Sequence, residues 1–451
     1  MPFQPQALDE RTLKKFVDRL LQSLRNEPTV SRAATQEHVA RMLGFQHWHE
    51  AIKAIGAPRT KPAVARAPLE APGLYPAEPL RFSKDHCEAL LLWALQFPSL
   101  SAVTVSSGDQ AMLEVAGRLY RVTQRQWTQE ECENMARAMG AAPASPTDSD
   151  RDFARSLSLA NGERHRVVGT LVPITQGNVP GIQVTARVHA AIPPALENLG
   201  YTPEQIEILR NALGREGLLI VSGSTGGGKS TTLAALTREQ AQRARTKHIV
   251  FNPYSDFEYH AIPTAPDSSI ESMDLQASNL TIASEIRRSL RRDPTHIMVD
   301  QARDMPTFTE SIHLAESGCH VNLGIHAESV SHTFSRCLRG FHEQWKPHAR
   351  QLIHVLNLVL AQRLVPTTDG RLVPVREWLV FTPSVRQSLL QMVDQTATLA
   401  HFCVLMEAFL QQQGHRFVED AKRLTEAGSL SEQTLNHYLR DAAARLRGYG
   451  E

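Results

Sequence analysis

The sequence predicts an α/β protein in which a mostly parallel sheet, covered by helices, follows a smaller α+β domain and a short helical module. Three patterns predict this fold class. From Gly217 onward, apolar strand-like runs alternate with helical runs, an order that produces a parallel sheet. Residues 81–200 combine helical spacing with hairpin-like runs. Residues 8–56 show helical spacing alone.

The first 80 residues divide into a helical module at 1–56 and a linker at 57–80. Apolar side chains three and four residues apart, such as Leu13, Phe16 and Leu20, predict helices in the module. Both a helix-turn-helix and a small packing bundle fit this pattern. Eight Lys and Arg against six acids in residues 8–56 are too weak a signal for nucleic-acid binding. The linker carries six prolines and no core pattern.

Composition and charge favour a globular protein of a reducing compartment. The net charge of +1 excludes a bulk positive field for nucleic acid or a membrane surface. The five cysteines form no C-x-x-C pair, which argues against disulfides or a zinc knuckle. The N-terminus does not resemble a signal peptide, and the apolar runs are far shorter than the roughly 20 residues of a membrane span. We therefore expect a cytoplasmic protein that reaches a membrane only through partners.

Residues 81–200 are expected to form one α+β domain, and residues 396–451 a helical tail. In the domain, helical runs flank one hairpin around Gly108 and a second hairpin after Arg164. No residue cluster there indicates chemistry. The tail reads as helices that either pack on the preceding domain or regulate and stabilise an assembly.

The run GLLIVSGSTGGGKSTT, which begins at Gly217, is the most specific signal in the chain. An apolar strand leads into 223–230, which matches G-x-x-x-x-G-K-[S/T], and a helix follows. The glycines allow backbone N–H groups to surround phosphate, and the helix adds its positive N-terminal dipole. We expect Lys229 to reach the β- and γ-phosphates of ATP and Ser230 to hold Mg²⁺.

Further motifs follow in a fixed order. An Arg-rich helix at 282–292 precedes the apolar strand His296–Asp300 and the dipeptide Arg303-Asp304. His320 and His326 then bracket another strand, and AQRLVP comes later. In this order the motifs resemble the secretion-ATPase superfamily of type II secretion, type IV pili and type IV secretion. Residues 81–395 carry the resemblance. The AQRLVP region and the domain before it look most like the DotB/TraJ branch of type IVB secretion and conjugative transfer, with the PilT-like pilus-retraction branch as the alternative.

The resemblance implies a PAS-like domain at 81–200 and a RecA-like P-loop ATPase domain at 201–395. It also implies a homohexameric ring that acts on the cytoplasmic side of an inner-membrane machine, with ATP and Mg²⁺ and with platform proteins of that machine as partners. His326 is implied as a γ-phosphate sensor. The residues implied to bind nucleotide are Gly223, Ser224, Thr225, Gly226, Gly227, Gly228, Lys229, Ser230, Thr231, His320, Arg166 and Arg187.

The chain departs from the family pattern at two acidic positions. The acidic box corresponds to the irregular IVFNPYSDFEYH, whose acids are Asp256 and Glu258, and we expect Glu258 to be the functional one. The second nucleotide strand ends Asp300-Gln301, where the family has Gly-Glu. Asp300 is expected to hold Mg²⁺. Gln301 can orient a water molecule, but an amide cannot accept a proton as a general base.

These departures lead to two alternative functions. The first is a motor ATPase that powers type IV secretion, conjugative transfer or a type IV pilus, including pilus retraction, with slow intrinsic hydrolysis. The second is a nucleotide-binding scaffold or regulator of such a machine, for which a paralogous, fully active ATPase is an implied partner. The retained histidines favour the motor, whereas Gln301 favours the scaffold.

Overall fold

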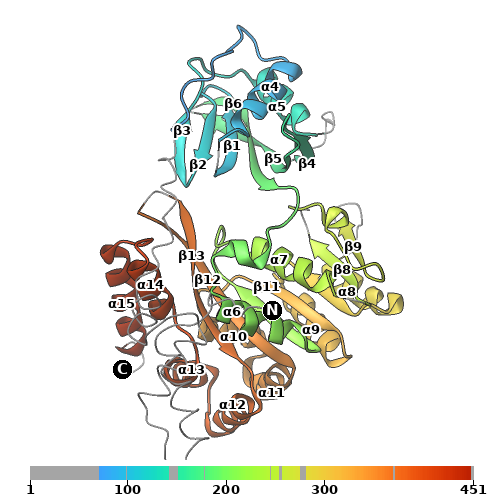
Figure 1. The fold of residues 1–451 in the computed structure, drawn as a ribbon, viewed down its shortest axis with the longest axis vertical. Helices are drawn as coiled ribbons and strands as arrows, with labels where there is room; N and C mark the ends of the chain where they lie inside the picture. The colour runs from blue at the N-terminus through green and yellow to red at the C-terminus, as the bar shows by residue number, and fades with distance from the viewer. Residues whose placement is uncertain are drawn as a thin grey trace, which may run out of the picture. The chain divides into compact units, whose positions relative to one another are not determined.

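The computed structural model describes residues 71–447, apart from short gaps at 98, 142–150, 177, 244, 253–255, 275–280 and 369–370 (Figure 1). The helical module predicted at 1–56 lies outside the described residues. Among the described residues, no helix combines the length and apolarity that crossing a membrane requires.

The first described domain is a six-stranded antiparallel sheet with two helices against it. The strand order is β3-β2-β1-β6-β5-β4. The strands are β1 (Leu100–Ser106), β2 (Met112–Val115), β3 (Arg118–Arg121), β4 (Arg151–Ser158), β5 (Arg164–Gln176) and β6 (Val179–Ala190). Helices α4 (Lys84–Ala94) and α5 (Gln129–Ala138) both begin at capping boxes, and their apolar faces join the sheet in one core. This arrangement is α+β, as expected, and its likeness to a PAS domain stays a prediction.

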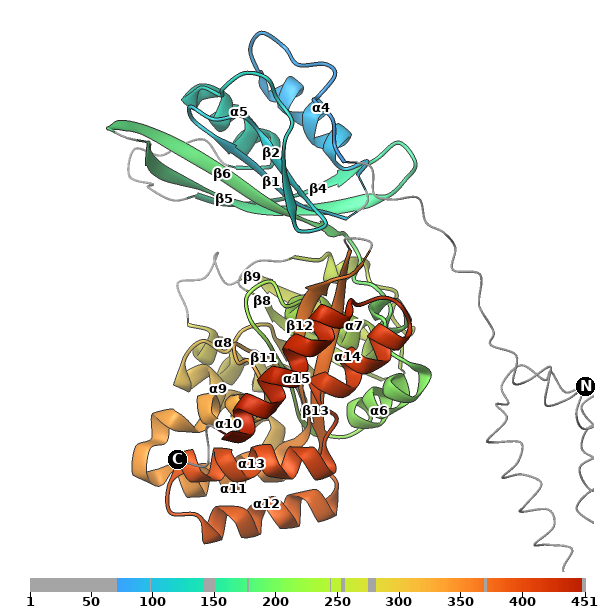
Figure 2. The ribbon, with the colours of Figure 1, turned by 90° about the vertical axis from the view of Figure 1, so that its left-hand side faces the viewer.

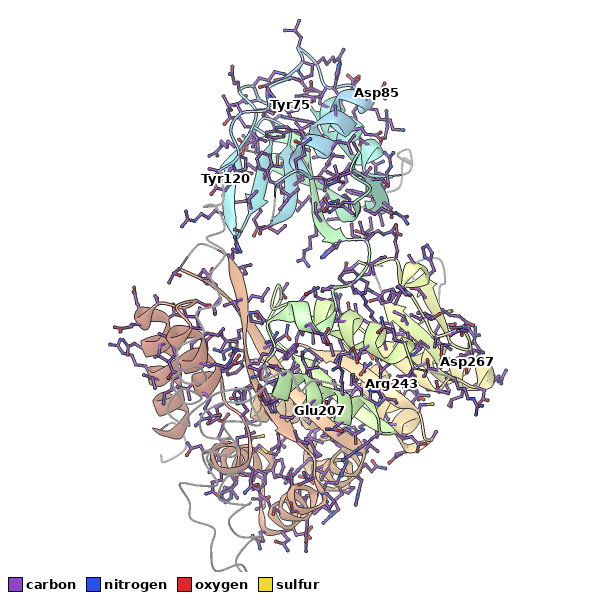
Figure 3. All side chains as sticks on the ribbon, viewed as in Figure 1. Tyr75, Asp85, Tyr120, Glu207, Arg243 and Asp267 are labelled. Carbon is purple, nitrogen blue, oxygen red and sulfur yellow. The ribbon has the colours of Figure 1, made fainter. Side chains whose placement is uncertain are left out.

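Three details of this domain differ from the sequence-based expectation. Tyr75, labelled in Figure 3, lies in the stretch predicted as linker, yet it is buried and its N–H donates to the carbonyl of Val122, so the domain begins before residue 81. Positive φ angles at Ala116 and Gly117 form a tight turn that adds the short strand β3 to the first hairpin. β4 was not predicted, because few of its residues are apolar.

The second domain is built on a seven-stranded sheet of order β13-β12-β7-β11-β10-β8-β9. Every neighbouring pair is parallel except the β12–β13 hairpin. The predicted, mostly parallel α/β sheet is therefore confirmed. Its strands are β7 (Gly217–Ser222), β8 (Lys247–Asn252), β9 (Ser269–Asp274), β10 (His296–Val299), β11 (His320–Ile325), β12 (Leu356–Pro366) and β13 (Leu372–Val380).

Helices cover both faces of this sheet because alternate strand residues point to opposite sides. Leu219 and Val221 of β7 pack with α6 and α7, whereas Leu218 and Ile220 join the core of the other face. The helices of the domain are α6 (Pro203–Leu213), α7 (Lys229–Ala241), α8 (Ile282–Ser289), α9 (Met305–Glu316), α10 (Val330–Leu338), α11 (Trp345–Val355), α12 (Pro383–Gln395), α13 (Leu399–Gln413), α14 (Phe417–Glu426) and α15 (Glu432–Arg447). Helix α6 begins at the predicted capping box of Thr202 and Gln205. Short 3₁₀ turns lie at Leu196–Leu199, Tyr259–Ala261, Leu290–Arg292 and Arg339–Gln344.

The C-terminal helices belong to the core of this second domain. Phe402 of α13, Phe417 of α14 and Tyr438 of α15 lie in the same hydrophobic cluster as the sheet residues. In Figures 1 and 2, α14 runs beside β13 at the edge of the sheet. Of the two roles open for residues 396–451, the packing role is the one that these contacts support.

Candidate nucleotide-binding site

The predicted site residues gather at the carboxyl edge of three neighbouring strands. β7, β11 and β10 lie side by side and parallel, so the chain leaves each of them at the same edge of the sheet. The glycine-rich loop follows β7, Asp300 follows β10 and His326 follows β11. Ligands of open α/β sheets bind in the crevice outside the carboxyl ends of strands, which makes this edge the candidate site.

The glycine-rich loop adopts backbone conformations and close contacts that favour glycine. Gly226 and Gly228 adopt φ of 74° and 80°, a region that residues with a Cβ rarely enter. A Cβ at Gly223 would lie 2.5 Å from the carbonyl oxygen of Gln362, so only glycine permits this close approach. Ser224, Thr225 and Gly226 are exposed at the tip, and Thr231 lies in the first turn of α7.

Lys229 begins α7, and its side chain turns back into the loop. Its Nζ donates to the carbonyl oxygens of Gly223 at 3.1 Å and Ser224 at 2.8 Å. Burial lowers the pKa of this amine, and the charge of Asp300 acts in the opposite direction. The loop carbonyls therefore hold the ammonium beside the loop, where it can exchange these carbonyls for phosphate oxygens as hydrogen-bond partners.

Ser230 and Asp300 form the part of the site that fits a divalent cation. The Ser230 hydroxyl donates to Oδ2 of Asp300 at 3.1 Å, and Oδ1 of this buried carboxylate has no hydrogen-bond partner among the described residues. Burial, followed by the charge of Asp256, raises the pKa of Asp300 to about 6. No group of three or more His, Cys, Asp or Glu in the described chain is arranged to hold a metal alone. Mg²⁺ commonly uses one or two protein oxygens together with phosphates and water, and Ser230 with Asp300 match that donor set.

His326 lies beside the lysine of the loop. Its Nδ1 is 3.4 Å from Nζ of Lys229, and the neutral ring can accept a hydrogen bond from the ammonium. Burial lowers the pKa of His326, and the charges of Lys229, Arg303 and Arg336 lower it further. A neutral imidazole at this position can keep its hydrogen bond to Lys229 when the ammonium moves toward a phosphate.

The side chain of Gln301 hydrogen-bonds Arg303 and takes no part in the contact between Ser230 and Asp300. Its Oε1 accepts two hydrogen bonds from the guanidinium of Arg303, at 2.8 and 2.6 Å. Asp304, the second residue of the Arg303-Asp304 dipeptide, caps α9 by accepting from the N–H of Thr307 at 2.7 Å. The amide oxygen of Gln301 is thus engaged within its own loop.

The acidic segment places its two carboxylates in different surroundings. Glu258, the acid that we expected to act at the nucleotide, is buried and forms an ion pair with Arg164 at 2.8 Å. Burial raises the pKa of Asp256 to about 6, while the charges of Arg187 and Arg166 lower it. The charge of Asp256 in turn acts on Asp300. Of the two acids, Asp256 is therefore the one whose charge acts on Asp300.

The predicted arginines Arg166 and Arg187 lie on β5 and β6. Both act electrostatically on Asp256, and Arg187 also lowers the pKa of Lys229. Arg166 additionally donates to the hydroxyl of Ser156 at 3.2 Å. A direct role of these arginines in nucleotide binding stays a prediction.

The prediction that His320 binds nucleotide is wrong. His320 begins β11 and lies in register with Gly217 at the start of β7, whereas the site is at the other ends of these strands. Its Nδ1 bonds to the carbonyl of Arg215 at 2.6 Å and its Nε2 to Asn322 at 3.1 Å. At roughly 3.3 Å per residue, the length of β11 separates it from His326. His320 is a buried strand histidine whose two nitrogens each face an acceptor oxygen, of which the neutral ring can donate to one.

Two further residues of the site were not identified from the sequence. Gly324 lies inside β11, where a Cβ would be 1.7 Å from the carbonyl oxygen of Asp300. An isolated glycine in an apolar strand often marks such a close backbone approach, and that signal was present. Gln362 of β12 contacts the loop with its side chain and its carbonyl, and only its place in the AQRLVP motif pointed to it.

Comparisons with known proteins agree with this geometry. The family model described as Type II/IV secretion system protein matches residues 117–422. A protein of Escherichia coli strain K12 described as uncharacterized protein YggR is 30% identical over 275 residues, or 59% of this chain and 79% of that protein. The type IV pilus ATPase PilU of Pseudomonas aeruginosa is 28% identical over 283 residues, which are 60% of this chain and 68% of the PilU chain.

Among solved structures, the ATPase DotB of Legionella pneumophila aligns with a TM-score of 0.70 and 26% identity, over 82% of this chain and 100% of that chain. These comparisons confirm the predicted resemblance to the secretion-ATPase superfamily and, within it, to DotB. They also confirm the predicted RecA-like ATPase domain. Because the family model covers more than half of the sequence, the chain belongs to the Type II/IV secretion system protein family.

Proposed function

We propose that this protein binds Mg²⁺-ATP at the 223–230 loop and hydrolyses it slowly. The observation that carries the proposal is the cluster of Lys229, Ser230 and Asp300 at one strand edge. The similarity to the ATPases PilU and DotB supports it. In this reading the loop N–H groups and the Lys229 ammonium bind the phosphates, while Ser230 and Asp300 hold the Mg²⁺.

The chain's own residues explain why hydrolysis is expected to be slow. When bound, Mg²⁺ supplies charge neutralisation at the phosphates. Lys229 leaves the loop carbonyls and compensates charge at the transferring phosphoryl group, with His326 beside it. Gln301 cannot take a proton from water, and its oxygen is occupied by Arg303. A missing general base typically costs about 10²–10⁴-fold in rate.

The biological setting is proposed from the family. The protein is a cytoplasmic homohexamer, bound to an inner-membrane platform, that powers type IV secretion, conjugative transfer or a type IV pilus. The second candidate function, a nucleotide-binding scaffold that assembles with an active paralogue, is favoured by one observation, the engagement of Gln301 by Arg303.

The test is to measure ADP binding, ATP hydrolysis and molecular mass with and without Mg²⁺-ATP, for the wild-type chain and for Lys229→Ala. We expect the wild type to bind ADP, to hydrolyse ATP slowly and to form a hexamer with ATP. Lys229→Ala should bind no measurable nucleotide. A folded wild-type chain that binds no ADP would refute the proposal. Binding without any hydrolysis would select the scaffold.

A further inference from the structure

Gln362 of β12 lies directly against the phosphate-binding loop. The residue is 2% exposed. The Nε2 group donates to the carbonyl oxygen of Gly227 at 2.6 Å, and Oε1 accepts from the hydroxyl of Thr232 at 2.9 Å. One amide therefore connects the loop to the first turn of the helix that follows it.

The backbone of Gln362 also supports the loop. A Cβ at Gly223 would lie 2.5 Å from its carbonyl oxygen, and a Cβ at Gly227 would lie 3.3 Å from the same atom. The loop thus rests on β12 at this residue, and two of its glycines leave the room for that contact. The Gly227 carbonyl can only accept, so it fixes which end of the amide faces the loop and leaves the amide oxygen for the Thr232 hydroxyl.

The hydrogen bond to Gly227 sets the direction of a peptide group. A trans peptide is planar, so the carbonyl of Gly227 and the N–H of Gly228 point in opposite directions. A carbonyl held toward β12 therefore directs the next N–H to the opposite side of the loop. If this peptide turned over, a carbonyl oxygen would take the place of an N–H donor, and it would repel an anion.

We propose that Gln362 is a positioning residue of the phosphate-binding loop. It holds the peptide between Gly227 and Gly228 so that an N–H, and not a carbonyl oxygen, faces the phosphate. The inference rests on the proposed ATP binding and adds to it a residue from outside the 223–230 motif. A purely structural role for the same amide would affect folding but leave nucleotide affinity unchanged.

The test compares two buried glutamines in the full-length chain. Gln362→Met keeps the size of the side chain and removes both hydrogen bonds. The matched control is Gln240→Met at the far end of α7, where the amide donates to the Leu213 carbonyl at 3.4 Å and accepts from Asn322 at 2.7 Å. ADP affinity with Mg²⁺, the KM and kcat for ATP, and the melting temperature are measured for each variant.

We expect Gln362→Met to weaken ADP binding and raise KM by about tenfold, since a lost or unsatisfied hydrogen bond commonly has an effect of that order. Gln240→Met should lower the melting temperature yet leave ADP affinity within about twofold of wild type. If Gln362→Met does not fold, Gln362→Glu decides. An ionised glutamate still accepts from Thr232 but cannot donate to Gly227, so at a pH that ionises it, ADP binding should weaken at least as much.

Two results would overturn the inference alone. One is wild-type ADP affinity in folded Gln362→Glu or Gln362→Met. The other is an equal loss of affinity in Gln362→Met and Gln240→Met. A wild-type chain that binds no ADP would overturn the proposed function, and the inference with it.

Discussion

The hydroxyl of Ser230 donates a hydrogen bond to Oδ2 of Asp300, and this contact joins the end of the phosphate-binding loop to the end of β10. The other carboxylate oxygen, Oδ1, is buried and has no partner in the described part of the chain. Burial of a charge without compensation is costly, so such a carboxylate is commonly held for a cation or a proton. The pair is where this protein is expected to respond to both Mg²⁺ and pH.

Asp300→Asn should separate nucleotide binding from metal-dependent turnover. The amide is a neutral and weaker Mg²⁺ ligand than the carboxylate, so we expect hydrolysis to fall by about 100-fold. ADP binding in EDTA should stay within a few-fold of wild type, because the loop is unchanged. Isothermal titration with and without Mg²⁺ measures this, and an equal loss of ADP affinity in EDTA would contradict the assignment.

The same substitution should change how stability depends on pH. The pKa of Asp300 is raised from 3.8 to about 6 in the folded protein, so its ionised form disfavours folding. Wild type should therefore gain stability as the pH falls from about 6 toward 4, and Asp300→Asn should lack that gain. Melting temperatures across this range check the sign. Asp256→Asn should also lose part of this gain, since the pKa of Asp256 is raised to about 6 as well.

Gln301→Glu tests the proposed cause of slow turnover. A glutamate there could accept a proton from the attacking water, so the rate of ATP hydrolysis should rise by about tenfold or more. Arg303 would hold the new carboxylate through the contacts that it now makes with the Gln301 oxygen, which limits the gain. The double variant Gln301→Glu with Arg303→Ala should release it and increase the rate further. An unchanged rate in both variants would show that position 301 does not limit hydrolysis.

The motifs that are local in sequence could be predicted, and those that depend on long-range pairing could not. The loop, Asp300 and His326 were found because each follows an apolar strand with recognisable chemistry. Gln362 supports the loop only because β12 pairs with β7, a neighbourhood that spacing does not reveal. His320 was misplaced because a histidine before a strand and one after it lie at opposite edges of the sheet.

Side-chain direction was the second limit of prediction. Asp256 and Glu258 are two residues apart in an irregular segment, where no strand or helix period fixes which of them faces the nucleotide. Glu258 turns to Arg164, while the charge of Asp256 acts on Asp300. Similarly, the C-terminal helices showed their helical pattern, but only tertiary packing shows that Phe402 belongs to the core of the ATPase sheet.

Gly324→Ala should disturb the site without touching a phosphate ligand. The new Cβ would lie 1.7 Å from the carbonyl oxygen of Asp300, so the segment after β10 must move. We expect a loss of roughly 1–3 kcal/mol in the free energy of unfolding and a lower Mg²⁺-dependent rate. Gly214→Ala is the control, because its Cβ would lie 3.5 Å from the nearest atom. It should change neither the free energy of unfolding nor the Mg²⁺-dependent rate. Unaltered turnover in Gly324→Ala would show that the carboxylate of Asp300 tolerates the shift.

His320 at the start of β11 and His326 just after its end offer a matched pair, because the same substitution should affect stability at the first position and turnover at the second. His326→Gln removes the ring beside Lys229, so kcat should fall by about tenfold while the melting temperature changes little. His320→Gln disturbs the buried polar contacts of this ring, which should cost roughly 1–3 kcal/mol of stability and leave ADP affinity unchanged. Thermal unfolding and steady-state ATPase assays of both variants decide the matter. If His320→Gln lowered nucleotide affinity at temperatures where it remains folded, the amino edge of the sheet would be coupled to the site, contrary to the position of this residue.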